Sequence, residues 1–178
     1  MTFPVFASGD VLNASDMNAV GLWLVKTQTI GTTVSSVQVT GAFSADYENY
    51  LVTVTGGASS TATKLTLTLG ATTTGYYFGG IGTSYAGTNT FASGANAANI
   101  DFIGYANTDG IAARFDVLAP NLAKPTVVST VYAQNLTTGT LFSIAGYVAN
   151  TTAYTAFTLT TGTGTLTGGT IRVYGYRN

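Results

Sequence analysis

The sequence predicts an all-β fold, an antiparallel sandwich or barrel, with a short helix near the N-terminus. From Thr27 onward, apolar and polar residues alternate with a period of two, which is typical of half-buried strands. The alternating runs are short, and Gly, Asn, Ser and Thr separate them, as expected for turns. No helical pattern lies between the runs, and strands without intervening helices favour an antiparallel arrangement.

The first 29 residues differ from the rest of the chain. Asn13 and Asp16 offer side-chain oxygens that suit a helix N-cap. Met17, Val20 and Leu24 follow at spacings that share one helical face. We therefore expect a helix over about residues 15–25, an N-terminal anchor segment over 1–29, and a β-sandwich domain over 30–178.

The remaining chain divides into short strands and one long excursion. β-branched and aromatic residues favour strands at 34–39, 50–55, 65–69, 100–105, 112–118, 126–134, 141–148, 155–160 and 170–176. Residues 70–99 are rich in Gly, Thr, Ser and Asn with scattered aromatics. We expect one or two short strands there, in a loop that is functional or covered by a partner.

Charged residues make up only 7% of the chain, and histidine and cysteine are absent. Proton shuttling near neutral pH, thiolate chemistry and most structural zinc sites need these residues. Asp101 and Asp116 lie on neighbouring predicted strands and form the acid pair that we considered for glycan cleavage. Strand ends and turns account for these acids more simply, so we expect no enzyme, no cofactor and no metal site.

The same composition bounds the partners of the chain. A net charge of −1 leaves no basic stripe for phosphates, so nucleic-acid binding is not expected. No run approaches the roughly 20 apolar residues of a membrane span, and no secretory signal is visible at the start. Few charges give little protection against association, so we expect assemblies in which neighbours cover apolar surface and strand edges.

Two groups of side chains are candidate contact sites. The apolar residues of the N-terminal segment form a candidate docking element, because a helix this short needs a packing partner: Phe3, Phe6, Leu12, Met17, Val20, Trp23 and Leu24. Tyrosines could instead stack on sugar rings at an exposed surface: Tyr76, Tyr77, Tyr85 and Tyr105. We favour the alternative that these tyrosines fill the core and subunit contacts.

Both ends of the chain carry a resemblance. Residues 8–18, SGDVLNASDMN, resemble the opening "G-x-V-L-T-A-x-D-M-N" of many small virion proteins of tailed bacteriophages. Residues 168–178, GGTIRVYGYRN, look like the final strand of phage fibre and minor tail domains. Residues 43–50, FSADYENY, resemble the "F-x-x-x-Y-x-x-Y" segment that leads into a core strand of the same proteins.

The resemblance implies a jelly-roll-like sandwich, a homotrimer, and attachment to other virion proteins through the N-terminal segment. It implies a structural part of a virion that is assembled in the host cytoplasm. The chain lacks the shaft repeats of long fibres, which leaves a tail-fibre or minor tail protein, a capsid decoration protein or a head fibre. A carbohydrate-binding module that recognises a host-surface glycan is the alternative from another class.

Overall fold

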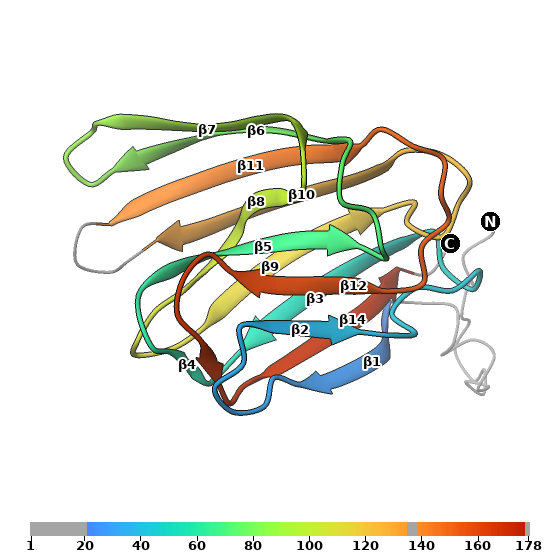
Figure 1. Cartoon of the computed structure of the whole chain (residues 1–178), viewed down its shortest axis with the longest axis horizontal. Coiled ribbons are helices and arrows are strands. Elements are labelled where there is room, and N and C mark those ends of the chain that lie inside the picture. The colour runs from blue at the N-terminus through green and yellow to red at the C-terminus, as the bar shows by residue number, and fades with distance from the viewer. Residues whose placement is uncertain (1–20, 135–138, 177–178) are drawn as a thin grey trace, which may run out of the picture.

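The computed structural model describes residues 21–134 and 139–176, and within these residues every regular element is a strand. The strands are β1 (Leu22–Thr29), β2 (Ser36–Val39), β3 (Asn49–Thr55), β4 (Ala58–Ser59), β5 (Thr63–Leu69), β6 (Tyr76–Ser84), β7 (Asn89–Ala97), β8 (Ile100–Ala106), β9 (Ala112–Leu118), β10 (Thr126–Gln134), β11 (Thr140–Val148), β12 (Phe157–Thr161), β13 (Leu166–Thr167) and β14 (Thr170–Tyr176) (Figure 1).

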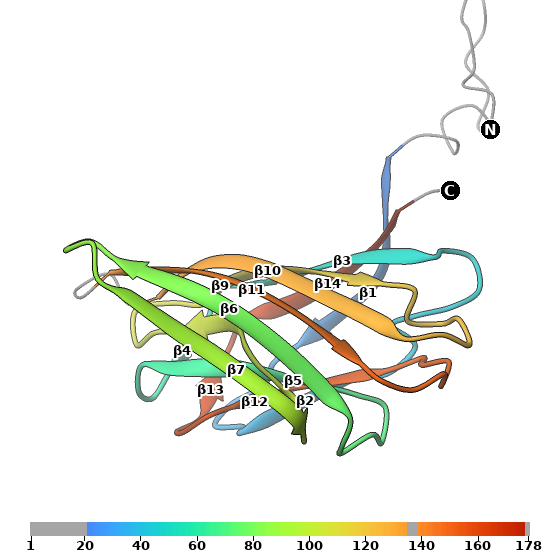
Figure 2. The same cartoon turned by 90° about the horizontal axis from the view of Figure 1, so that it is seen from above.

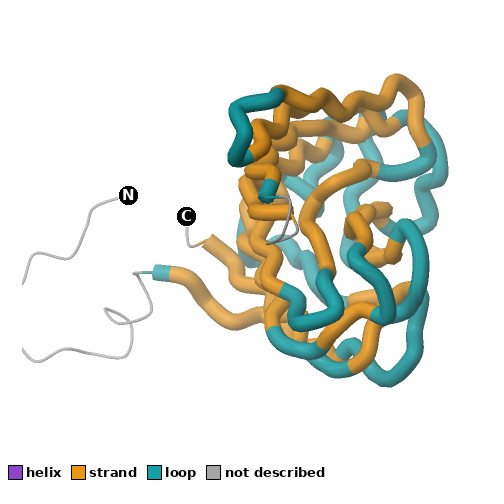
Figure 3. Tube along the Cα trace, turned by 90° about the vertical axis from the view of Figure 1, so that its left-hand side faces the viewer, coloured by secondary structure: helices purple, strands orange, loops and turns teal. Residues whose placement is uncertain are grey.

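The strands form two main antiparallel sheets. The large sheet has eight strands in the order β1-β14-β3-β9-β10-β11-β6-β7, and the small sheet has four in the order β2-β12-β5-β8. A further pair, β13-β4, closes one end. Figure 2 shows the two main sheets as facing layers, and Figure 3 shows the same layers from the side. The predicted all-β sandwich is therefore confirmed, whereas its jelly-roll connectivity stays an expectation.

The core lies between the inner faces of the two sheets. Phe157 of the small sheet meets Phe115 of the large sheet edge to face, with ring centroids 6.2 Å apart. Phe157 also stacks on Phe43 at 5.6 Å. All three rings are buried, and contacts of this kind add to the hydrophobic stabilisation of the core.

A second, smaller cluster fills the space under the β10-β11 end of the large sheet. It consists of Tyr132, Phe142 and Ile144, with Phe102 of β8 packed against it. The Phe142 ring stacks on Phe102 at 5.6 Å and on Tyr132 at 5.8 Å. This stack lets the large sheet extend beyond the main core while its inner face stays covered.

The predicted helix over 15–25 is wrong where the structure describes the chain. Residues 22–25 belong to β1, which pairs with β14 from Leu22↔Tyr176 to Thr29↔Thr170. Gly21 precedes this strand with a φ of 105°, which a helix does not use. Residues 15–20 lie outside the described residues. The first half of β1 and the end of β14 bend away from the small sheet (Figures 2 and 3).

Residues 70–99 contain longer strands than the sequence predicts. β6 and β7 have nine residues each and form a hairpin at one edge of the large sheet. Glycine at position 80 allows this packing, because a Cβ there would collide with Ile144 of β11. A Cβ at Gly94 would likewise collide with the Phe78 ring. These glycines lower strand propensity, yet the close approach of the strands requires them.

Candidate interaction surface

The outer face of the large sheet is the candidate interaction surface. Side chains alternate between the two faces of a strand. In β10, Val128, Thr130 and Tyr132 turn inward and are buried, while Val127 and Val131 turn outward. The pairings of β10 with β9 and β11 carry this alternation across the neighbouring strands. The outward set therefore forms one continuous surface.

That surface is rich in large apolar side chains, with smaller polar residues such as Ser129 and Ser143 between them. Nine of the ten large hydrophobic side chains that are exposed in the described residues occupy outward positions of this sheet: Leu22, Leu24, Ile81, Phe91, Leu118, Val127, Val131, Leu141 and Tyr147. Val131, at the centre of the sheet, is 72% exposed. Single exposed hydrophobic residues are ordinary on a protein surface, whereas the gathering of nearly all of them on one face distinguishes this face from the rest of the molecule.

Four neighbouring strands of the eight that form this surface carry no charged side chain. Strands β10, β11, β6 and β7 contain no Asp, Glu, Lys or Arg. The charged side chains that we assign to this face are Arg114 and Asp116 on β9 and Arg172 on β14. Charge is thus confined to the β14-β3-β9 half.

The Asp116 carboxylate on this face accepts a hydrogen bond from a tyrosine. The Tyr176 hydroxyl donates to Oδ1 of Asp116 at 2.5 Å, reaching across β3. Burial raises the pKa of Tyr176 above its ordinary value, and the hydrogen bond to Asp116 and the charge of that carboxylate raise it further. The phenol therefore stays protonated at neutral pH and satisfies one oxygen of the carboxylate.

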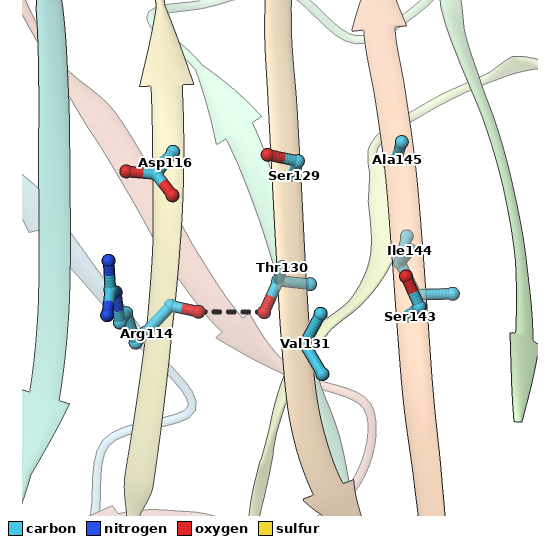
Figure 4. Close-up of a pocket in the computed structure, with 8 residues that line it drawn as sticks. All are labelled: Arg114, Asp116, Ser129, Thr130, Val131, Ser143, Ile144 and Ala145. Carbon is cyan, nitrogen blue, oxygen red and sulfur yellow. Dashed lines mark hydrogen bonds between the residues drawn. The ribbon is translucent and has the colours of Figure 1, made fainter.

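Small residues form a shallow hollow in the middle of the face. Asp116, Ser129 and Ala145 pair across β9, β10 and β11 and border a space of about 380 Å³, seen in Figure 4. The Thr130 hydroxyl donates to the Arg114 carbonyl at 2.7 Å beside it. A second hollow of about 340 Å³ shares Ala145. The face is therefore ridged rather than flat, with recesses that a side chain of a partner can fill.

The opposite face of the molecule has different chemistry. Outward positions of the small sheet that water reaches carry mostly hydroxyl and amide groups: Ser36, Gln38, Lys64, Thr68, Thr158 and Thr160. None of the large exposed hydrophobics found in the described residues lies there. The two outer faces thus separate an apolar surface from one that water solvates well.

The four candidate tyrosines do not form one surface. Tyr76 is fully buried: its hydroxyl accepts from the Leu69 N–H at 2.7 Å and donates to the Thr72 carbonyl at 3.1 Å. Burial raises the pKa of Tyr76 to about 12. Its inclusion in a surface site is therefore wrong. Tyr77 stacks on Tyr147 of β11 on the apolar face, with ring centroids 5.3 Å apart.

The other two tyrosines lie apart from that pair. Tyr85 is 66% exposed in the β6–β7 turn. Tyr105 packs against the smaller cluster on the inner side of the sheet. Tyr77 and Tyr85 thus remain accessible, but the structure does not bring the set together around one ligand.

Two of the predicted contact residues of the N-terminal segment lie in the described residues. Leu24 turns outward on β1 and adds to the apolar face, whereas Trp23 pairs with Gly175 and points to the other side. Phe3, Phe6, Leu12, Met17 and Val20 lie outside the described residues. The strand therefore separates Trp23 from Leu24.

The considered acid pair is not formed. The Asp101 carboxylate on β8 accepts from Lys64 Nζ at 2.5 Å in the small sheet, while Asp116 lies on the outer face of the large sheet. Over residues 21–134 and 139–176, we find no group of three or more acidic side chains arranged to hold a metal ion. The part of the chain that the structure describes contains no helix with the length and hydropathy of a membrane span.

One feature of the sequence does indicate the apolar face, although the alternation of apolar and polar residues does not. β10 and β11 carry large apolar residues at consecutive positions, and therefore on both faces of the strand, such as Val127 with Val128 and Leu141 with Phe142. Strands that are apolar on both faces are typical of sheets covered on both sides. Only the register between strands places these residues on one surface.

Comparisons with known proteins give weak likenesses. No protein-family model matches the chain, and no curated protein matches it. Among solved structures, the tripod (BppUct-A-L) from the baseplate of bacteriophage Tuc2009 is 12% identical, with a TM-score of 0.27, over 100% of this chain and 75% of that one. The VP2 subviral particle of infectious bursal disease virus is 11% identical, with a TM-score of 0.15, over 86% and 39%. At these TM-scores neither likeness carries an argument.

Proposed function

We propose that this chain is a non-enzymatic structural component of a tailed-phage particle, a tail-associated fibre or minor tail protein, that assembles with copies of itself. The observation that carries the proposal is the apolar outer face of the large sheet. An exposed apolar surface of this extent is costly in water and is stabilised when a partner covers it. The proposed role is therefore that of a building block.

The occupant that we propose for the apolar face is another copy of the chain. Half of the face carries no charge, so two such halves approach each other without desolvating an ion. The other half offers two arginines, Arg114 and Arg172, and one carboxylate, Asp116, and charges of both signs permit complementary pairing between copies. The homotrimer implied by the family resemblance is the oligomeric state that we propose.

The virion location rests on the sequence resemblance at residues 8–18, 43–50 and 168–178. A capsid decoration protein or a head fibre would use the same apolar face, so the face alone does not choose between tail and head. Imaging of particles that carry a labelled copy of the chain makes this distinction.

The experiment that tests the proposal places a charge on the apolar face. Val131→Glu puts a carboxylate at the most central exposed position, and burying it against a copy would cost several kcal/mol. At low protein concentration, we expect light scattering to give the monomer mass of 18.2 kDa for this variant and a multiple of that mass for the wild type. We also expect the variant to be missing from purified particles.

The matched control is Gln38→Glu, which adds the same charge to an exposed position of the small sheet. It should assemble and enter particles like the wild type. Equal behaviour of the two variants would contradict the proposal that the large sheet carries the contact.

A further inference from the structure

Strand β7 is an open edge of the large sheet. It is the last strand in the order, and β6 is its one partner strand within the described residues. Phe91, near its middle, is 77% exposed. An open edge presents a row of unpaired backbone N–H and C=O groups that another strand can bind.

The hairpin geometry identifies which backbone groups face outward. Ser84 N–H donates to the Thr88 carbonyl at 2.9 Å, next to the turn. Hydrogen-bonded and non-hydrogen-bonded pairs alternate along an antiparallel ladder. The pairs Thr83↔Asn89, Ile81↔Phe91 and Gly79↔Ser93 are therefore of the non-hydrogen-bonded kind.

It follows that Asn89, Phe91 and Ser93 turn their N–H and C=O groups away from β6. The side chains of the same three residues lie on the apolar outer face. Between them, Thr90 and Ala92 bond to β6 and turn small side chains inward. The outward groups are thus regularly spaced, and their neighbours leave room for a second strand.

This edge also lacks the features that prevent pairing. No charged residue occurs between Lys64 and Asp101, and β7 contains no proline. The opposite edge, β1, carries Lys26 and a bulge between Leu24 and Lys26. Lysine and bulges are features that discourage edge-to-edge pairing, so the two edges of the large sheet differ.

We propose that β7 pairs with β7 of a second copy, antiparallel, about a two-fold axis at Phe91. In this register Phe91 faces Phe91 of the copy, and Asn89 faces Ser93 of the copy. All the outward N–H and C=O groups of Asn89, Phe91 and Ser93 on both strands are then hydrogen-bonded.

The second copy fits this edge better than a charged or bulky partner. The two uncharged strands meet without repulsion, and each exposed Phe91 ring is covered by the other. The outer faces of the two sheets then join into one wider apolar face, continuous with the surface proposed above for assembly. The inference rests on the proposed function, because both involve copies of this chain. The β7–β7 edge contact is nevertheless a different contact from the one proposed for the outer face of the large sheet.

A strand-to-strand contact alone buries less than the 1,200–2,000 Å² that is typical of stable interfaces. The pairing is therefore concentration-dependent in solution and stronger where a particle holds copies together. This property gives the measurement: the mass should double with rising concentration, and the extra step should depend on Asn89 and Ser93.

The test uses two double variants of the full-length chain. Asn89→Lys with Ser93→Lys places like charges opposite each other only between copies, because within one strand the two positions are about 13 Å apart. Asn89→Asp with Ser93→Lys places opposite charges there and is the matched control. We expect sedimentation equilibrium at low salt to give pairing about tenfold weaker for the first variant and at least as strong as wild type for the second.

Amide hydrogen exchange gives an independent readout. With rising concentration, the N–H groups of Asn89, Phe91 and Ser93 should become protected, while those of Thr90 and Ala92 are protected throughout. Equal pairing of the two double variants, or exchange at the three outward amides that ignores concentration, would overturn the edge contact. Loss of assembly in Val131→Glu would still support the proposed function in that case. A chain that stays monomeric at every concentration overturns both.

Discussion

Two buried tyrosines have opposite hydrogen-bonding states. The Tyr76 hydroxyl has both a donor and an acceptor as partners. The Tyr132 hydroxyl is buried, and it has no partner among the described residues. Burial raises the pKa of both phenols. A buried hydroxyl without a hydrogen bond costs free energy, so the two side chains should respond differently to loss of the oxygen.

We expect Tyr132→Phe to leave the free energy of unfolding unchanged or to raise it by up to about 1 kcal/mol. The substitution removes an unpaired polar group and keeps the ring stack on Phe142. We expect Tyr76→Phe to lower the free energy of unfolding by roughly 1–3 kcal/mol, because the buried Leu69 N–H loses its acceptor. Urea denaturation measures both. A similar loss in the two variants would mean that the Tyr132 hydroxyl has a partner, such as a buried water.

The same two positions explain a limit of the sequence prediction. Tyr76 and Tyr77 are adjacent, and adjacent residues of a strand point to opposite faces. Only one of them can belong to a surface site once residues 76–84 form a strand. The glycine-rich sequence of residues 70–99 predicts mostly loop, and a loop imposes no such alternation, so the sequence alone leaves both tyrosines as candidates for one surface.

At the scale of elements, strand prediction succeeded where apolar alternation is uninterrupted. The expected runs at 112–118, 126–134 and 170–176 coincide with β9, β10 and β14. The sequence predicted only one or two short strands where β6 and β7 have nine residues each, because Gly79, Gly80 and Gly82 lower the strand signal. At Gly80 and Gly82 a Cβ would collide with Ile144 and Phe142 of β11, which are remote in sequence, so a local pattern does not contain the reason for these two glycines.

The helix prediction failed for a related reason. The spacing of Met17, Val20 and Leu24 fits one helical face, but Leu22–Val25 contain residues that also favour strands. The backbone partners supplied by β14 decide between the two structures, and this partner lies at the far end of the chain.

Because β1 spans Leu22–Thr29, a deletion that tests the N-terminal segment should end before residue 22. We expect a chain that lacks residues 1–20 to keep the β1–β14 pairing and to be absent from purified particles. A chain that lacks residues 1–29 loses β1 as well, so it should be less stable in urea because β14 loses a partner strand. Normal incorporation of the shorter deletion into particles would rule out the anchor role.

At the scale of the whole molecule, the composition shows that charged residues are scarce, but it does not show where on the surface they lie. The 7% of charged residues indicated surfaces meant to be covered. Which surface this is depends on the register of eight strands drawn from the whole length of the chain. For that reason the apolar face follows from the structure, and the sequence supplied only the expectation that such a face exists.

The nature of this face determines how assembly responds to salt. Since half of the face is uncharged, we expect light scattering to give the same assembly mass from low salt to about 1 M NaCl, where surface ion pairs are screened. Sulfate should strengthen assembly, because it favours burial of apolar surface. Dissociation at high NaCl would instead mean that Arg114, Asp116 or Arg172 carries the contact.

The contrast between the two outer faces has a practical consequence for imaging. One side of the sandwich presents Val131, Leu141 and Phe91, and the other presents threonine hydroxyls. A dispersed copy of this chain is therefore amphiphilic, and at an air–water boundary it lowers its free energy by turning the large sheet toward the air. In a thin vitrified film, single copies will lie with their strands parallel to the film and present one predominant view, whereas assembled copies with this face covered will tumble freely.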